Sequence, residues 1–157
     1  MQRETKFRAW DKLEKRMGEV NYIKYSNVQY TYVSARFKQK EKVVDEGFNY
    51  GDKNGCDNVI LMQYTGIRDK NGVEIYEGDI IHWKTDINNK YLGNFKIEED
   101  EIVEWSKEEL KWIVREKGAS AFDELKDLTD YDFEVIGNIY ENPELLKEAN
   151  KLRNEDF

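Results

Sequence analysis

The fold is decided by the stretch Leu61-Met-Gln-Tyr-Thr-Gly-Ile-Arg-Asp-Lys-Asn-Gly-Val-Glu-Ile-Tyr-Glu-Gly-Asp-Ile-Ile-His-Trp83. Two runs rich in β-favouring residues, 59–64 and 75–83, flank the tetrapeptide Asp-Lys-Asn-Gly at 69–72. Asn-Gly favours a type I′ turn, because both central residues of that turn need a positive φ. The stretch therefore predicts a β-hairpin. A second turn follows at 77–79, where a glycine lets the backbone enter the next strand.

Strand patterns continue on both sides of this hairpin. Residues 6–23 alternate polar and apolar side chains around a charged turn, which predicts an N-terminal hairpin. A further alternating run leads to Phe37, and two apolar runs within 95–114 predict another long hairpin. Residues 133–140 predict the last strand.

Other segments favour turns or helices. Residues 38–46 are charged and have good helix propensity, so a short helix and a mobile loop both fit them. Residues 85–93 are polar and typical of a turn. Residues 120–128 begin with a serine that can cap a short amphipathic helix. Asn142 and Pro143 suit the start of a C-terminal helix, whose apolar side would pack on its own sheet or on another subunit.

We therefore expect a mainly β (α+β) chain. The expected architecture is an SH3-like, strongly bent or partly open β-barrel with an N-terminal hairpin and two or three short helices. The length fits a single domain, 1–157. An alternative division separates an N-terminal hairpin and variable segment, 1–58, from a barrel-like core with the C-terminal helix, 59–157.

The charge balance bears on the choice of partner. A formal net charge of -8 disfavours nonspecific binding to nucleic acid unless basic residues gather on one face. Tyr30, Tyr32, Arg36 and Lys38 are the candidates for a partner-binding surface, because aromatic and basic side chains together can also bind single strands. The acidic run 98–101 is interpreted as a solvated edge, because alternating side chains on a strand seldom converge on a cation.

The sequence contains no convincing catalytic motif. Cys56 is the single cysteine, which excludes an internal disulfide and any multi-cysteine zinc site. His82 is the single histidine, and no local motif supports a catalytic pair with Cys56. Glu77 and Asp79 could serve a hydrolase as paired carboxylates, but turn chemistry is the preferred interpretation of their spacing. We expect no catalytic residue, no cofactor and no metal site.

Several longer motifs lie at both ends and in the middle of the chain. They are Lys6-Phe-Arg-Ala-Trp-Asp11 followed by Met17, Gln63-Tyr-Thr-Gly66, Asp69-Lys-Asn-Gly72, Glu74-Ile-Tyr-Glu-Gly-Asp-Ile80 and Glu134-Val-Ile-Gly-Asn-Ile-Tyr-Glu-Asn-Pro-Glu-Leu-Leu146. Together they resemble the signature of the YopX family of phage and prophage proteins. Segments 27–58 and 85–132 carry no matching signature. The resemblance implies a small protein encoded by phages of Gram-positive bacteria, with a β-barrel-like body, a tendency to form homo-oligomers and no assigned catalytic residues.

These observations lead to one main functional hypothesis and one alternative. The main hypothesis is a noncatalytic phage accessory protein that forms a homo-oligomer and binds a host or phage protein. The alternative is a small β-barrel module associated with nucleic acid. No secretion signal opens the chain and its apolar runs are too short to span a bilayer, so we expect a cytoplasmic protein of the host bacterium without membrane contact.

Overall fold

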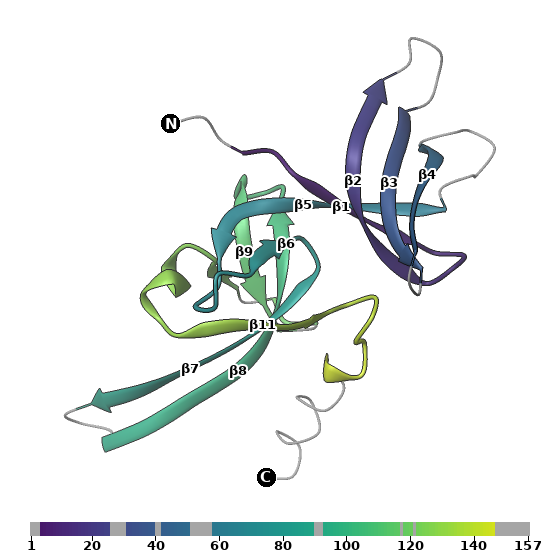
Figure 1. Cartoon of the computed structure of the whole chain (residues 1–157). Helices are drawn as coiled ribbons and strands as arrows, with labels where there is room; N and C mark the ends of the chain where they lie inside the picture. The colour runs from purple at the N-terminus through teal and green to yellow at the C-terminus, as the bar shows by residue number, and fades with distance from the viewer. Residues whose placement is uncertain are drawn as a thin grey trace. The chain divides into compact units, whose positions relative to one another are not determined.

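The computed structural model shows a chain made mainly of antiparallel β-strands (Figure 1). It describes residues 4–25, 31–39, 42–50, 58–89, 93–116, 118–120 and 122–146. The chain divides into two compact units, Met1–Tyr64 and Thr65–Phe157. The prediction of a mainly β chain is confirmed.

The first unit is built on five strands in the order β4-β3-β2-β1-β5. They are β1 (Phe7–Asp11), β2 (Arg16–Tyr25), β3 (Thr31–Gln39), β4 (Lys42–Tyr50) and β5 (Val59–Arg68). The predicted N-terminal hairpin is confirmed, because β1 and β2 pair with Arg8 opposite Glu19. Strand β5 runs on into the second unit, where it pairs with β6 (Glu74–Tyr76).

The segment 38–46 differs from its prediction. Strands β3 and β4 pair antiparallel along their whole lengths, so the predicted helix or mobile loop is wrong for the residues that the structure describes. Phe48 of β4 packs edge-on against Phe37 of β3, with ring centroids 5.9 Å apart. Packing of Val44 and Phe48 against the core of the first unit outweighs the helix propensity of the charged residues in this segment.

The core of the first unit gathers around one buried aromatic ring. Its buried members are Ala9, Ala35, Phe37 and Val59. Gly18 lies close to the ring of Phe37, and a Cβ at this glycine would be 2.6 Å from the ring atoms. The guanidinium group of Arg16 covers the same ring at 4.4 Å and pairs with Asp11 and Glu46.

The second unit contains a sheet in the order β10-β9-β8-β7-β11. Its strands are β7 (Asp79–Asn89), β8 (Gly93–Ser106), β9 (Lys111–Arg115), β10 (Asp123–Glu124) and β11 (Phe133–Asn138). The predicted second long hairpin is confirmed by β8 and β9, in which Trp105 lies opposite Trp112. The predicted last strand is confirmed by β11.

Strands β7 and β8 extend together as a long two-stranded ribbon (Figure 1). Their pairing continues to Asn89 opposite Gly93, so the predicted turn at 85–93 is wrong outside 90–92, which are not described. Both faces of a two-stranded ribbon can meet water, so polar residues suit it. Asp86 and Lys96, opposite each other, form an exposed ion pair at 3.6 Å.

Two apolar clusters lie on the two faces of the sheet of the second unit. The larger one contains the buried residues Ile75, Ile81, Trp83, Val103, Val114, Leu125, Leu128 and Phe133. The smaller one contains Ile80, Ile102 and Leu146. Successive residues of a strand point to opposite faces, so β7 and β8 contribute to both clusters. The middle of this sheet is therefore buried on both sides.

The prediction of two or three short helices is not supported. Helical residues in the described parts of the chain are limited to a 3₁₀ turn, Asp127–Asp130, and to 145–146. The segment 120–128 instead contributes β10, and the backbone N–H of Leu125 donates to the carbonyl of Trp112. Pairing with β9 satisfies backbone groups that a short helix would leave open at its ends. The rest of the predicted C-terminal helix lies outside the described residues.

The described strands do not form a closed barrel. One sheet ends in β4 and β6, and the other ends in β10 and β11. The structure therefore supports two antiparallel sheets, and a closed barrel is not found.

The central hairpin forms as predicted, but the type of its turn is different. Gly72 has a φ of +80°, whereas Asn71 does not adopt a positive φ. The Gly72 N–H donates to the Asp69 carbonyl, and the Asp69 N–H donates to the Val73 carbonyl, both at 2.9 Å. This is a type I turn followed by a glycine bulge, so the type I′ prediction is wrong. The Asp69 carboxylate favours this geometry because it accepts the Asn71 N–H at 2.8 Å.

Candidate functional site

The Asp69 carboxylate joins the central turn to the last strand. Its Oδ1 accepts the backbone N–H groups of Asn71 and Val73, each at 2.8 Å, and its Oδ2 accepts the N–H of Val135 at 3.1 Å. Burial by itself raises the pKa of Asp69, but the hydrogen bonds from Val135, Val73 and Asn71 outweigh burial and hold the pKa below its ordinary value. Asp69 therefore stabilises the fold as a charged, internally bonded group.

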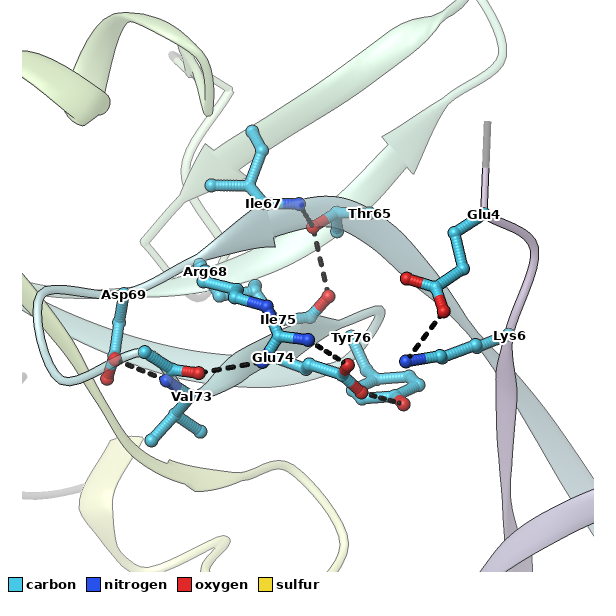
Figure 2. A network of polar contacts seen from close by, with 11 residues as sticks. Glu4, Lys6, Thr65, Ile67, Arg68, Asp69, Val73, Glu74, Ile75 and Tyr76 are labelled. Atoms are coloured by element: carbon cyan, nitrogen blue, oxygen red, sulfur yellow. Dashed lines mark hydrogen bonds and ion pairs between the residues drawn. The ribbon is translucent and has the colours of Figure 1, made fainter. Parts of the chain in front are cut away.

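Polar side chains continue this network along the hairpin (Figure 2). The Thr65 hydroxyl donates to the Ile75 carbonyl at 2.9 Å. Arg68 donates to one carboxylate oxygen of Glu74 at 2.5 Å, and the Tyr76 hydroxyl donates to the other at 2.8 Å. These contacts hold β5 and β6 together by their side chains as well as their backbones.

The next turn uses Asp79 in a similar way. Its Oδ2 accepts the Tyr76 N–H at 2.7 Å, and the residue is only 1% exposed. Gly78 supplies the positive φ of +80° that the turn requires. Asp79 therefore serves the turn, and the arrangement with Glu77 is not an open carboxylate pair.

Asn138 organises the chain after β11. Its Oδ1 accepts the N–H groups of Tyr140 and Glu141, at 3.0 and 2.9 Å. The side chain of Asn142 folds back and accepts the Asn138 N–H at 3.3 Å. A Cβ at Gly137 would lie 2.6 Å from the Oδ1 atom of Asn142, so glycine leaves room for this contact.

Three of the four predicted partner-binding residues share one face of β3. Tyr32, Arg36 and Lys38 alternate along the strand with fully buried apolar residues that face the core. Tyr30 lies outside the described residues. Side chains from β2 and β4 complete this surface, which we call the outer face and define by Tyr22, Tyr32, Arg36, Lys38, Val43 and Asp45.

The outer face combines apolar side chains with a neutralised charge. Tyr22 and Val43 are 54% and 60% exposed, and the ring of Tyr22 lies 6.1 Å from that of Tyr32. Arg36 donates to Asp45 at 3.0 Å. The hydrogen bonds from Arg36 and from Asn21 hold the pKa of Asp45 below its ordinary value. The face is therefore amphipathic and not strongly basic.

The single histidine lies between two carboxylates on the ribbon. Its Nδ1 is 2.8 Å from Asp100 and its Nε2 is 3.2 Å from Glu98. Cys56 lies outside the described residues, so the structure does not place it beside His82. Both ring nitrogens of His82 are thus occupied by carboxylate partners.

The acidic run holds one residue that the sequence interpretation missed. Glu101 is 3% exposed, so the prediction of a solvated edge is wrong at this position. The indole N–H of Trp83 donates to Glu101 at 2.7 Å. Burial, together with the charges of Glu99, Asp123 and Glu116, raises the pKa of Glu101 to about 7, against the lowering effect of the Trp83 hydrogen bond. The alternation of side chains along β8 was the available signal, because it turns every second acid inward.

The described residues offer neither a metal-binding cluster nor a membrane-spanning helix. No group of three or more His, Cys, Asp or Glu residues within the described ranges could hold a metal ion. Within the same ranges, no helix has the length and apolar character needed to cross a membrane.

The comparison with protein families decides the relationship that the motifs indicated. The family model described as "YopX protein" matches residues 6–147. The chain belongs to the YopX family. No curated protein matches it.

Two solved structures extend this relationship. Protein EF1440 from Enterococcus faecalis is 29% identical with a TM-score of 0.57, and the match covers 92% of this chain and 99% of that one. Protein yopX from Bacillus subtilis is 20% identical with a TM-score of 0.52, covering 89% of this chain and 96% of that one. The second likeness shows the fold alone.

The YopX-like motifs therefore have a structural explanation in this chain. Asp69, Gly72, Asp79 and Asn138 all stand in the quoted motifs, and each supplies a turn with a hydrogen bond or a positive φ. The described partner-binding candidates, Tyr32, Arg36 and Lys38, lie outside these motifs, on the outer face. The quoted motifs therefore hold residues that build the fold.

Proposed function

We propose that this YopX-family protein is a noncatalytic accessory protein of a phage or prophage, which forms a homo-oligomer and binds a protein partner. The phage role and the assembly rest on the resemblance of the motifs to the family. The partner class rests on the outer face.

The observation that carries the choice of a protein partner is the chemistry of the outer face. Exposed Tyr22 and Val43 offer apolar contact area of the kind that protein interfaces bury at their centres. Arg36 is already engaged by Asp45, and the charge of Glu19 acts on it as well. A guanidinium group neutralised in this way attracts a phosphate backbone weakly.

The absence of an enzymatic activity is part of the proposal. The three buried aspartates of the motifs, Asp11, Asp69 and Asp79, accept hydrogen bonds from backbone N–H groups, and a carboxylate engaged in this way is a poor general base.

The test uses the protein as bait in extracts of a phage-bearing host. A variant carrying Tyr22→Ser and Val43→Ser should lose the partner that the wild type retains. Leu13→Ser is the matched control, because Leu13 is 70% exposed in the turn between β1 and β2 and is not a member of the outer face. A partner retained equally by all three proteins would place the binding surface elsewhere, and reproducible failure of the wild type to retain any partner would refute the proposal.

A nucleic-acid-associated role is the second candidate. The neighbouring rings of Tyr22 and Tyr32 could stack on bases, and Lys38 lies on the same face. Such binding should weaken steeply as salt increases. Fluorescence anisotropy with single-stranded DNA and RNA at low salt decides this alternative, which an unchanged signal at high protein concentration would exclude.

A further inference from the structure

Strand β4 forms one end of the strand order in the first unit. Within the described residues, β3 pairs with one side of β4 and no strand pairs with the other. The register between β3 and β4 shows no shift, and β4 contains no proline. An edge strand of nine residues without a bulge or a proline presents backbone N–H and C=O groups that a further strand can pair with.

Three side chains on one face of β4 form a self-complementary pattern. Lys42, Val44 and Glu46 alternate along the strand and so point to the same side. Lys42 is exposed, and Val44 is half-buried against the core of the first unit. The side chain of Glu46 is 41% exposed while one of its oxygens accepts a hydrogen bond from Arg16 at 2.6 Å. A positive, an apolar and a negative residue therefore follow each other.

When two copies of β4 pair antiparallel about a two-fold axis, residues opposite each other must point to the same face of the sheet. The axis must therefore pass beside a residue and not between two residues. Centring the axis on Val44 places Lys42 of each copy opposite Glu46 of the other, with the two Val44 residues facing each other. Centring it on Asp45 or on Glu46 places identical acids opposite each other. Within β4, centring it on Val43 or Gly47 brings no opposite charges together. Opposite charges across a strand pair stabilise it and like charges destabilise it.

We propose that two copies of this chain associate through their β4 strands, paired antiparallel about a two-fold axis at Val44. This inference rests on the homo-oligomer of the proposed function and specifies one of its interfaces. The sheet then continues from one copy into the other, the edge of β4 is covered, and the half-buried Val44 side chains bury each other. Arg16 keeps Asp11 as a second partner, so Glu46 can share its carboxylate with Lys42 of the other copy.

The test is a charge exchange with recovery on mixing. Lys42→Glu places two acids opposite Glu46 residues, and Glu46→Lys places two bases opposite Lys42 residues. Each variant alone should raise the dissociation constant at least about tenfold. A mixture of the two variants places opposite charges across the interface again, so the association should recover. Lys24→Glu and Glu19→Lys are matched controls on β2, which is not an edge strand.

Light scattering coupled to size exclusion, over a concentration series, separates the outcomes. A loss of mass in each variant and its return in the mixture is the expected result, and the return also shows that both variants fold. Unchanged masses in both variants would overturn the β4 interface and leave the assembly intact. A loss without recovery would overturn the register. A wild-type protein that is monomeric throughout would overturn both the assembly and this interface.

Discussion

Glu101→Gln should remove a dependence of stability on pH that arises from one buried carboxyl group. Glutamine keeps an oxygen that can accept the indole N–H of Trp83, and it removes the charge from the buried site. The change therefore isolates ionisation from packing. Three nearby acids, Glu99, Asp123 and Glu116, raise the pKa of Glu101 in addition to its burial.

The sign and size of the effect follow from the pKa, which rises from 4.5 to about 7 on folding. Between these values the native state holds a proton on Glu101 that the unfolded state has lost, so stability falls as the pH increases. The stabilising contribution is complete below pH 4.5 and is lost as the pH passes through about 7. The full difference corresponds to about 3 kcal/mol, which solvent screening reduces to about 2 kcal/mol.

Urea unfolding followed by tryptophan fluorescence measures this effect in the unit that contains Glu101. Trp83, Trp105 and Trp112 lie in the second unit. The variant should gain about 2 kcal/mol over the wild type between about pH 5 and about pH 8.5. The other titrating groups are the same in both proteins, so their contributions cancel when the free energy of unfolding of the wild type is subtracted from that of the variant. Glu108→Gln in the exposed turn after β8 is the control for loss of one negative charge.

A difference between Glu101→Gln and the wild type that stays constant across this pH range would refute the reasoning. It would mean that Glu101 ionises in the native state as readily as in the unfolded chain. A difference in the free energy of unfolding that does not change with pH would reflect only how the glutamine side chain packs at this position.

Three further predictions concern stability. Asp69→Ala should destabilise the protein by about 3 kcal/mol, because three backbone N–H groups lose their acceptor. Asp69→Asn should lower the free energy of unfolding by a smaller amount, and urea unfolding midpoints measure the difference between the two variants. The lowered pKa of Asp69 means that its stabilising contribution is present above pH 3.8 and is lost as the pH falls through the folded-state pKa; the wild type should show this loss in acid and Asp69→Ala should not. Gly18→Ala should destabilise the first unit by about 1–3 kcal/mol, because the new Cβ would meet both the Phe37 ring and the carbonyl oxygen of Arg36, and an unchanged thermal midpoint would contradict this.

The sequence indicated much of the fold because hairpins depend on local chemistry. Strand alternation located the N-terminal hairpin, the hairpin of β8 and β9, and the last strand. Glycine identified the turns at Gly72 and Gly78, because both positions have a positive φ that other residues adopt at a cost. The type of the turn at 69–72 could not be predicted from its glycine, because hydrogen bonds from the backbone to the Asp69 side chain determine it.

The segments that were predicted wrongly are those whose structure depends on distant partners. Residues 38–46 have a local preference for helix, but the strand β4 that begins in this segment packs its Phe48 against Phe37 of β3. Residues 120–128 could have formed a helix, but Leu125 bonds to Trp112 of β9. Local propensities differ by less than about 1 kcal/mol per residue, so burial of large apolar side chains overrides them.

The sequence by itself determined the β-rich class, the hairpins, the glycine turns and the family motifs, because each depends on residues close together in the chain. Only the tertiary structure decided the role of particular charged groups. Asp69 reaches the backbone of Val135, and Trp83 reaches Glu101 across a strand pair. Two acids in similar polar stretches thus end with opposite pKa shifts, because one is surrounded by N–H donors and the other by apolar residues and further carboxylates.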